Sequence, residues 1–201
     1  MTKTPLNEKK TYSILGVDPG LHTTGYGVLQ VIHGTVRLLE AGVIRSHAPT
    51  LATRVYDIYQ GIHEVIETFH PQILALEELY SLYKRPVTAI LMGHARGAIC
   101  LAAAQANIEM VPYAATKIKK ILTGNGRASK DQIQRAIQRE LQLKDYPEPP
   151  DVADALAIAL CHFYHGKLSI TPSRLPSFLS SSFLSKKSYL LTKIAPKQKE
   201  P

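Results

Sequence analysis

Four acidic residues stand where a predicted fold would bring their side chains together. Asp18 follows one short apolar run, and Glu77 lies near the end of another. Asp151 and Asp154 are spaced i, i+3, which puts both carboxylates on one helix face about 5–6 Å apart at Cβ. Such a cluster repels itself by several kcal/mol unless a cation is present. Hard divalent ions, Mg²⁺ or Mn²⁺, are the natural occupants, and two of them about 4 Å apart suit phosphodiester hydrolysis.

Each acid also has a structural explanation. Asp18 precedes Pro-Gly and is a common turn residue there. Asp151 after two prolines suits a helix N-cap, and Asp154 suits the positive end of the helix dipole. Glu77 is harder to dismiss, because it and Glu78 interrupt an apolar strand where unpaired charges are costly. Strand alternation turns these two glutamates to opposite faces without showing which one faces the site.

Other chemistries find less support in the sequence. No Ser-His-Asp or Cys-His nucleophile arrangement is present, and the glycine-rich turn 20–27 lacks the Gly-Lys-Ser/Thr of a nucleotide phosphate loop. Cys161, His162 and His165 have too few partners for a zinc site. Cys100 and Cys161 both lie in apolar helical patterns, so we expect buried free thiols rather than a disulfide.

The elements that position the acids follow from hydrophobic periodicity and turn signals. We predict strands at 13–17, 26–32, 36–44 and 73–79, an extended segment at 109–113, and helices at 50–70, 87–107, 114–122, 130–141 and 151 to about 165. A hairpin turn at His33-Gly34 joins the second and third strands. Strands first, then strands alternating with helices, indicate an α/β fold with a mixed sheet of about five strands.

The composition fits one soluble globular domain, since 45% of the 201 residues are hydrophobic and 20% are charged. The organisation we predict is a polar extension at 1–12, a folded domain at 13–165 and a tail at 166–201. Residues 1–11 are polar and are not followed by the apolar segment of a secretory signal, so we predict no such signal here. The longest nearly apolar segment, 87–104, contains His94 and Arg96, so we predict no membrane span and a cytoplasmic protein.

The net charge of +8 indicates a polyanionic partner, but its distribution is uneven. The tail carries seven basic residues against one acid, which leaves only +2 on the first 165 residues. A nucleic-acid surface on the folded part must therefore be a local cluster of positive charge. The tail, rich in serine and proline, reads as poorly ordered; it is either a non-functional extension or a source of salt-sensitive affinity for DNA.

Five short blocks occur in order: ILGVDPG at 14–20, TGYGV at 24–28, ALE at 75–77, GHARG at 93–97 and DVADALA at 151–157. Together they closely resemble the RuvC family, the crossover junction endodeoxyribonucleases of bacteria, over about residues 13–165. The resemblance implies an RNase H-like fold and a homodimer. It also implies symmetric nicking of four-way Holliday junctions with two Mg²⁺ ions per active site, for which Mn²⁺ substitutes. RuvA and RuvB, the branch-migration proteins, are the implied partners.

The same resemblance assigns roles to the acids. It selects Glu77 over Glu78 as the catalytic glutamate, and it makes Asp18, Asp151 and Asp154 the remaining catalytic metal ligands. None of the four is substituted in this sequence, which supports an active enzyme.

DNA contacts are implied as well. Tyr80 matches an aromatic residue that stacks on a base near the opened junction centre, which is worth about 1–3 kcal/mol; the alternative is an ordinary tyrosine at a strand end. Lys119 and Lys130 match basic positions that face DNA phosphate, and Lys130 would also balance developing charge. Three further basic residues complete the local positive cluster: Lys117, Lys120 and Arg127. The segment 81–86 departs from the family, so its cleavage-sequence preference is not carried over.

Three alternatives stay open. An actin-like ATPase begins with a similar strand and glycine-rich turn, but it needs two such domains and this chain has room for one. A junction-binding module without catalysis conflicts with the intact carboxylates. Another RNase H-like nuclease, acting on an RNA–DNA hybrid or a different branched DNA, is compatible with the sequence.

Overall fold

The core of the protein is a mixed five-stranded sheet with strand order β3-β2-β1-β4-β5. The computed structural model describes residues 11–78 and 86–168. The strands are β1 (Tyr12–Asp18), β2 (Thr23–Ile32), β3 (Thr35–Arg45), β4 (Ile73–Glu77) and β5 (Glu109–Tyr113). β1 pairs antiparallel with β2, and β2 pairs antiparallel with β3. β4 runs parallel to both β1 and β5, so the predicted mixed α/β sheet is confirmed.

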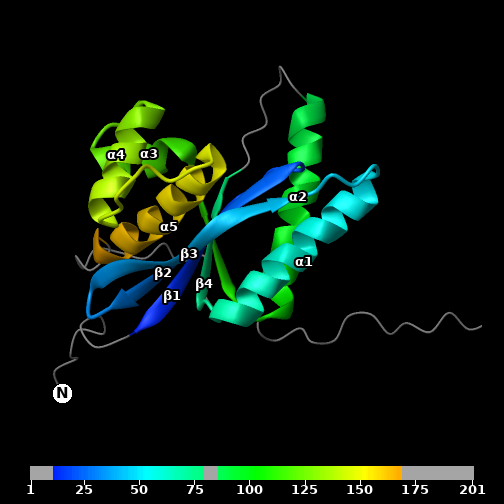
Figure 1. Cartoon of the computed structure of the whole chain (residues 1–201), viewed down its shortest axis with the longest axis horizontal. Helices are drawn as coiled ribbons and strands as arrows, with labels where there is room; N and C mark the ends of the chain where they lie inside the picture. Colours follow the sequence, from blue (N-terminus) through cyan, green and yellow to red (C-terminus); the bar gives the residue numbers. More distant parts are fainter. Residues whose placement is uncertain (1–10, 79–85, 169–201) are drawn as a thin grey trace, which may run out of the picture. The chain divides into compact units, whose positions relative to one another are not determined.

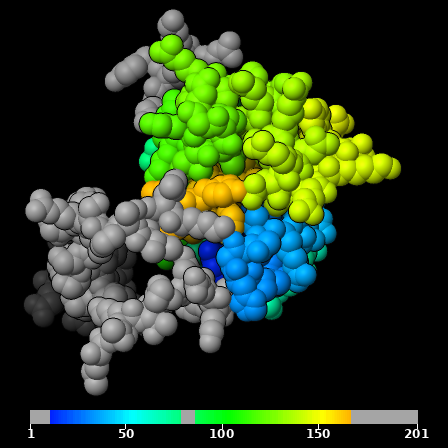
Figure 2. Space-filling view, turned by 90° about the vertical axis from the view of Figure 1, so that its left-hand side faces the viewer, coloured from blue at the N-terminus to red at the C-terminus, as the bar shows by residue number. Residues whose placement is uncertain are grey.

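Five helices cover the sheet, two on one face and three on the other (Figure 1). They are α1 (Leu51–Phe69), α2 (Pro86–Gln105), α3 (Ala115–Thr123), α4 (Lys130–Glu140) and α5 (Pro150–Leu168). α1 and α2 pack on one face in a core that includes Leu15, Val17 and Leu76. α3, α4 and α5 pack on the other face, and the end of α5 reaches the surface between α3–α4 and β2–β3 (Figure 2).

The helix boundaries have local causes. The Thr50 side chain accepts a hydrogen bond from the Thr53 amide and caps α1, which ends where His70 adopts a left-handed conformation with φ of 45°. α4 begins with a capping box between Ser129 and Gln132.

Several predicted boundaries were wrong by a few residues. β2 starts at Thr23 rather than at 26, because Thr23 still pairs with Arg45 in the ladder with β3. β4 ends at Glu77 rather than at 79, and α5 continues past 165 to Leu168. Of the two thiols, Cys161 is buried as expected, whereas Cys100 is only half-buried. The predicted extension 1–12 and tail 166–201 lie almost wholly outside the described residues.

Close packing of α5 on the sheet depends on glycines in β1 and β2. A Cβ atom at Gly16 would lie 2.3 Å from the Ala155 carbonyl oxygen, and one at Gly25 would lie 2.0 Å from the Asp151 carbonyl oxygen. Neither distance is possible for a real side chain, so α5 lies against the strand backbones themselves. The N-terminal end of α5 is therefore held next to the end of β1.

β5 is an edge strand and carries Pro112. The Tyr113 carbonyl oxygen accepts a hydrogen bond from the Glu78 amide, so the backbone groups of Tyr113 face β4. Backbone groups of successive strand residues point in opposite directions, which places the missing N–H of Pro112 on the free edge.

Among the described helices, α2 alone has the length and hydropathy of a membrane span. A core helix of a soluble protein passes the same test. α2 packs on α1 and β5 through a face that includes Ala95, Ile99 and Ala102, and its Arg96 donates a hydrogen bond to the end of β4. We therefore treat α2 as part of the globular fold.

Candidate active site

Asp18 and Glu77 end two neighbouring parallel strands on the same face of the sheet. Side chains alternate along β1, so Asp18 shares the α5 face with Ile14, while Leu15 and Val17 face α1 and α2. Ala75 belongs to the α5-side core, so Glu77, two residues later, also faces α5. Because Val17 pairs with Leu76, the two acids occupy adjacent positions one residue further along.

The first turn of α5 brings the other two acids to this strand end. Gly25 pairs with Asp18 across β1 and β2 and lies directly under the Asp151 backbone. Asp154 is one turn further along α5 and is half-buried. Strand ends and helix start thus meet at one place, as the i, i+3 spacing and the strand pattern predict.

The electrostatics of the site are those of crowded, partly desolvated carboxylates. Burial, with the negative charges of Asp154, Glu77 and Asp151, raises the pKa of Asp18 to about 7, while the positive charge of Lys130 opposes the shift. Burial also raises the pKa of Glu77, again with help from Asp154 and against the charge of Lys119. In Asp154, burial outweighs the two nearby lysines and raises the pKa. The cluster therefore has a deficit of positive charge.

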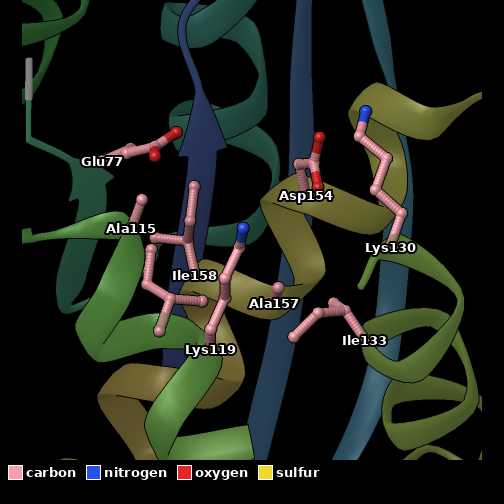
Figure 3. Close-up of a pocket in the computed structure, with 9 residues that line it drawn as sticks. Glu77, Ala115, Lys119, Lys130, Ile133, Asp154, Ala157 and Ile158 are labelled. Carbon is pink, nitrogen blue, oxygen red and sulfur yellow. The ribbon is translucent and has the colours of Figure 1, made fainter. Parts of the chain in front are cut away.

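A cavity of about 210 Å³ adjoins the carboxylates between α3, α4 and α5 (Figure 3). Its base is apolar and includes Ile133 and Ile158. Glu77 and Asp154 lie on its acidic side, and Lys119 and Lys130 bring their amino groups toward the same end (Figure 3). A phosphate group at this end would meet positive charge beside the acids.

The donor set fits divalent metal ions. Hard carboxylate oxygens in a partly buried site that lacks positive charge suit Mg²⁺ or Mn²⁺ better than softer ions. Among residues 11–78 and 86–168, no group of three or more His, Cys, Asp or Glu side chains is already arranged to hold an ion.

The structure separates the predicted site residues into three groups. It brings six of them to the strand end or the adjoining cavity: Asp18, Glu77, Asp151, Asp154, Lys119 and Lys130. Tyr80 and the unusual segment 81–86 lie outside the described residues, except for Pro86 at the start of α2. Glu78 is exposed and does not line the cavity.

The remaining basic residues are exposed and lie away from the cavity lining: Lys117, Lys120 and Arg127. The Lys117 ammonium lies 5.1 Å from the centre of the Tyr113 ring and 3.5 Å from His165 Nε2, so it contributes to packing between α3, β5 and α5. His162 Nδ1 shares a 2.9 Å hydrogen bond with the Tyr113 hydroxyl.

One residue at the site was missed by the sequence analysis. Arg96, from the GHARG block, donates a hydrogen bond to the backbone carbonyl oxygen of Glu77. A lone arginine inside an apolar helical pattern was the available signal, because such a charge requires a specific partner when it is partly buried.

A sheet with this strand order and acids at the ends of its central strands defines the RNase H-like class of folds. Comparison with known proteins narrows the class. The RuvC family, described as crossover junction endodeoxyribonuclease RuvC, matches residues 14–162. The crossover junction endodeoxyribonuclease RuvC of Rhodopirellula baltica is 53% identical over 152 residues, covering 75% of this chain and 85% of that protein.

Solved structures agree with the sequence match. Thermus thermophilus RuvC in complex with a Holliday junction substrate superposes with a TM-score of 0.73 at 33% identity, covering 78% of this chain and 96% of that one. The yeast mitochondrial Holliday junction resolvase shares the fold with a TM-score of 0.55 at 12% identity, and covers 78% of this chain and 81% of that one. The chain belongs to the RuvC family of crossover junction endodeoxyribonucleases, whose members are metal-dependent nucleases.

Proposed function

We propose that this protein resolves four-way Holliday junctions by paired, symmetric nicks. The observation that carries the proposal is the meeting of two strand ends and one helix start, where carboxylates with raised pKa values stand beside two lysines. Family membership supports the reaction, and the Thermus relative was solved with this substrate.

Asp18, Glu77, Asp151 and Asp154 would hold the metal, for which two Mg²⁺ ions are the best fit. When bound, such ions supply an activated water and stabilise the leaving oxygen. The acids themselves must be ionised to bind cations, so the carboxyl of Asp18 has to lose its proton. Lys119 and Lys130 would contact phosphate oxygens at the same end of the cavity and hold the strand in place.

A homodimer is part of the proposal, since two symmetric nicks need two active sites and the chain provides one. α2 offers a surface for the second copy. An exposed stripe along this helix includes three large apolar side chains, Val87, Ile90 and Leu101, which are 68%, 61% and 54% exposed. Gly97 lies in that stripe and Gly93 lies beside it, and a Cβ atom added at either would meet nothing within 4 Å beyond the backbone of its own helix. A second α2 helix can therefore approach closely there.

Tyr80 is proposed to stack on a base near the junction centre, and it follows the strand end that carries Glu77. RuvA and RuvB are proposed partners because a junction must be moved to the cleavage site. We propose a cytoplasmic location, since the bacterial relatives of this chain act on cellular DNA.

A cleavage assay on purified protein tests the proposal. The substrates are a mobile four-way junction, a linear duplex and an RNA–DNA hybrid, each with and without Mg²⁺, and Asp18→Asn is the control. We expect paired nicks on opposing junction strands that require Mg²⁺ and disappear in the variant, while the variant still binds the junction.

The other outcomes would each reject the proposal in a different way. Selective junction binding without cleavage would identify a binding module. Cleavage of the hybrid alone would identify another RNase H-like nuclease. Equal cleavage of duplex and junction would remove the structural selectivity on which the proposed function depends.

A further inference from the structure

The end of β4 is held by groups that come from outside the β1–β4 ladder. The paired positions of β1 and β4 stop at Val17 and Leu76, one residue before Glu77. On its other side, β4 is fixed by the Glu78 amide, which donates to the Tyr113 carbonyl oxygen at 2.8 Å. The carbonyl group of Glu77 receives its hydrogen bond from the Arg96 guanidinium of α2.

This contact crosses from one side of the sheet to the other. The Glu77 side chain faces α5, whereas α2 packs on the opposite face. Arg96 therefore reaches the backbone of Glu77 and leaves the carboxylate free. The positive charge that lowers the pKa of Glu77 belongs to Lys119 on the α5 side, so Lys119 is the electrostatic partner and Arg96 supplies a fixed position.

We propose that Arg96 is a positioning residue that sets the placement of the Glu77 carboxylate through its backbone carbonyl and makes that placement depend on α2. The inference deepens the proposed function and rests on it. Arginine suits this task because its planar group offers several donors in fixed directions, whereas lysine offers one flexible ammonium.

The hydrogen bond from Arg96 to the Glu77 carbonyl oxygen has a second consequence, because Arg96 belongs to α2. Residues 87, 90, 94, 97 and 101 form the exposed stripe, and Arg96 lies outside it, toward the buried face that includes Ala95 and Ile99. A partner docked on the stripe would press on the same rigid helix that holds the Glu77 carbonyl. Dimer formation and placement of one metal ligand are thereby linked through a single helix.

The test replaces the donor and measures metal binding separately from cleavage. Arg96→Met removes the donors at similar length, Arg96→Lys keeps the charge, and Arg139→Met on α4 is an exposed control with the same change of charge. Mn²⁺ affinity is measured by calorimetry without DNA, Mg²⁺ dependence by single-turnover junction cleavage, and folding by thermal unfolding.

For Arg96→Met we expect Mn²⁺ affinity to fall about 10–100-fold, the usual effect of losing a group that orients a metal ligand. Cleavage should fall at low Mg²⁺ and recover at high Mg²⁺, junction binding in Ca²⁺ should stay within about threefold, and Arg96→Lys should be intermediate. In a Glu77→Gln background, Arg96→Met should have no further effect on Mn²⁺ affinity.

The double variant separates positioning from general damage. An equal additional loss of Mn²⁺ affinity in the Glu77→Gln background would overturn the inference, as would unchanged affinity in Arg96→Met. If Arg96→Met does not fold, Arg96→Lys alone decides in the same two backgrounds. Failure of the wild-type protein to cut junctions would instead reject the proposed function, while the Mn²⁺ measurements would still decide the role of Arg96.

Discussion

Helices pack on the two faces of the sheet in different ways. On the α5 face, glycines at positions 16 and 25 let the helix backbone touch the strand backbone, and the candidate metal-binding acids gather where these elements end. On the α1–α2 face, large side chains such as Leu15 and Ile62 separate helices from strands, and α2 leaves apolar side chains exposed. The α5 face fixes the positions of the acids, and the opposite face carries the surface that we propose for a second copy.

The largest effect is expected on the α5 face, from Asp18→Asn. Loss of one ligand charge removes several kcal/mol of charge stabilisation, which corresponds to about 10³-fold in rate. Junction affinity should stay equal or rise, because a negative charge near DNA phosphate is removed. Gel-shift and single-turnover cleavage assays measure the two quantities; a parallel loss of both would mean that Asp18 supports the fold instead.

A charge on the opposite face should act on assembly. Leu101→Glu places an unpaired carboxylate in the exposed stripe of α2 and should weaken the dimer about 100-fold or more. Sedimentation velocity measures the change, and Glu64→Gln on α1 is a surface control. Paired nicks should become single, unsynchronised nicks. A dimer that survives Leu101→Glu would place the interface elsewhere.

Adding one methyl group should distinguish the two packing modes. Gly16→Ala forces a contact of 2.3 Å with the Ala155 carbonyl oxygen and should lower the free energy of unfolding by about 1–3 kcal/mol. The added methyl group of Gly97→Ala in α2 meets nothing within 4 Å beyond its own helix backbone, so this variant should raise the free energy of unfolding by about 0.5–1 kcal/mol. Urea unfolding at low protein concentration measures the stability of both variants. A Gly16→Ala protein as stable as Gly97→Ala would show that α5 moves away from β1 at no cost in stability.

The last effect concerns the pH dependence of stability in the absence of metal. Because the pKa of Asp18 is raised to about 7 in the folded protein, the folded state binds more protons than the unfolded chain between about pH 4 and 7. Stability should therefore fall as pH rises through this range and level off above it. Thermal unfolding in a chelator at pH 5 and 8 should show this decline, and Asp18→Asn should reduce it. Mg²⁺ should restore stability at pH 8.

Much of this arrangement was predictable, and the rest depends on long-range packing. The i, i+3 spacing of Asp151 and Asp154 and the strand pattern were sufficient to bring the acids together. Side-chain alternation along the strand could not show which of Glu77 and Glu78 faces the site, and only the resemblance to the RuvC family selected Glu77. The structure gives the physical reason: Leu76 faces α1 and α2, so Glu77 must face α5.

Other features could not be read from local sequence. The start of β2 at Thr23 was missed because Thr23 to Gly25 have the composition of a turn, and only pairing with β3 makes them a strand. The partner of Arg96 lies 19 residues earlier in the chain and depends on where α2 docks. Cys100 is half-buried because the helix carrying it has a partly exposed surface.

Pro112 affects how the protein behaves while it folds, before any dimer forms. Parallel strands from distant parts of the chain pair late in folding, and an open strand edge then invites pairing between molecules. Because Pro112 has no N–H to point outward from β5, this edge cannot complete a regular ladder with a strand from another chain. Pro112 therefore reduces aggregation of newly synthesised chains through this edge of the sheet.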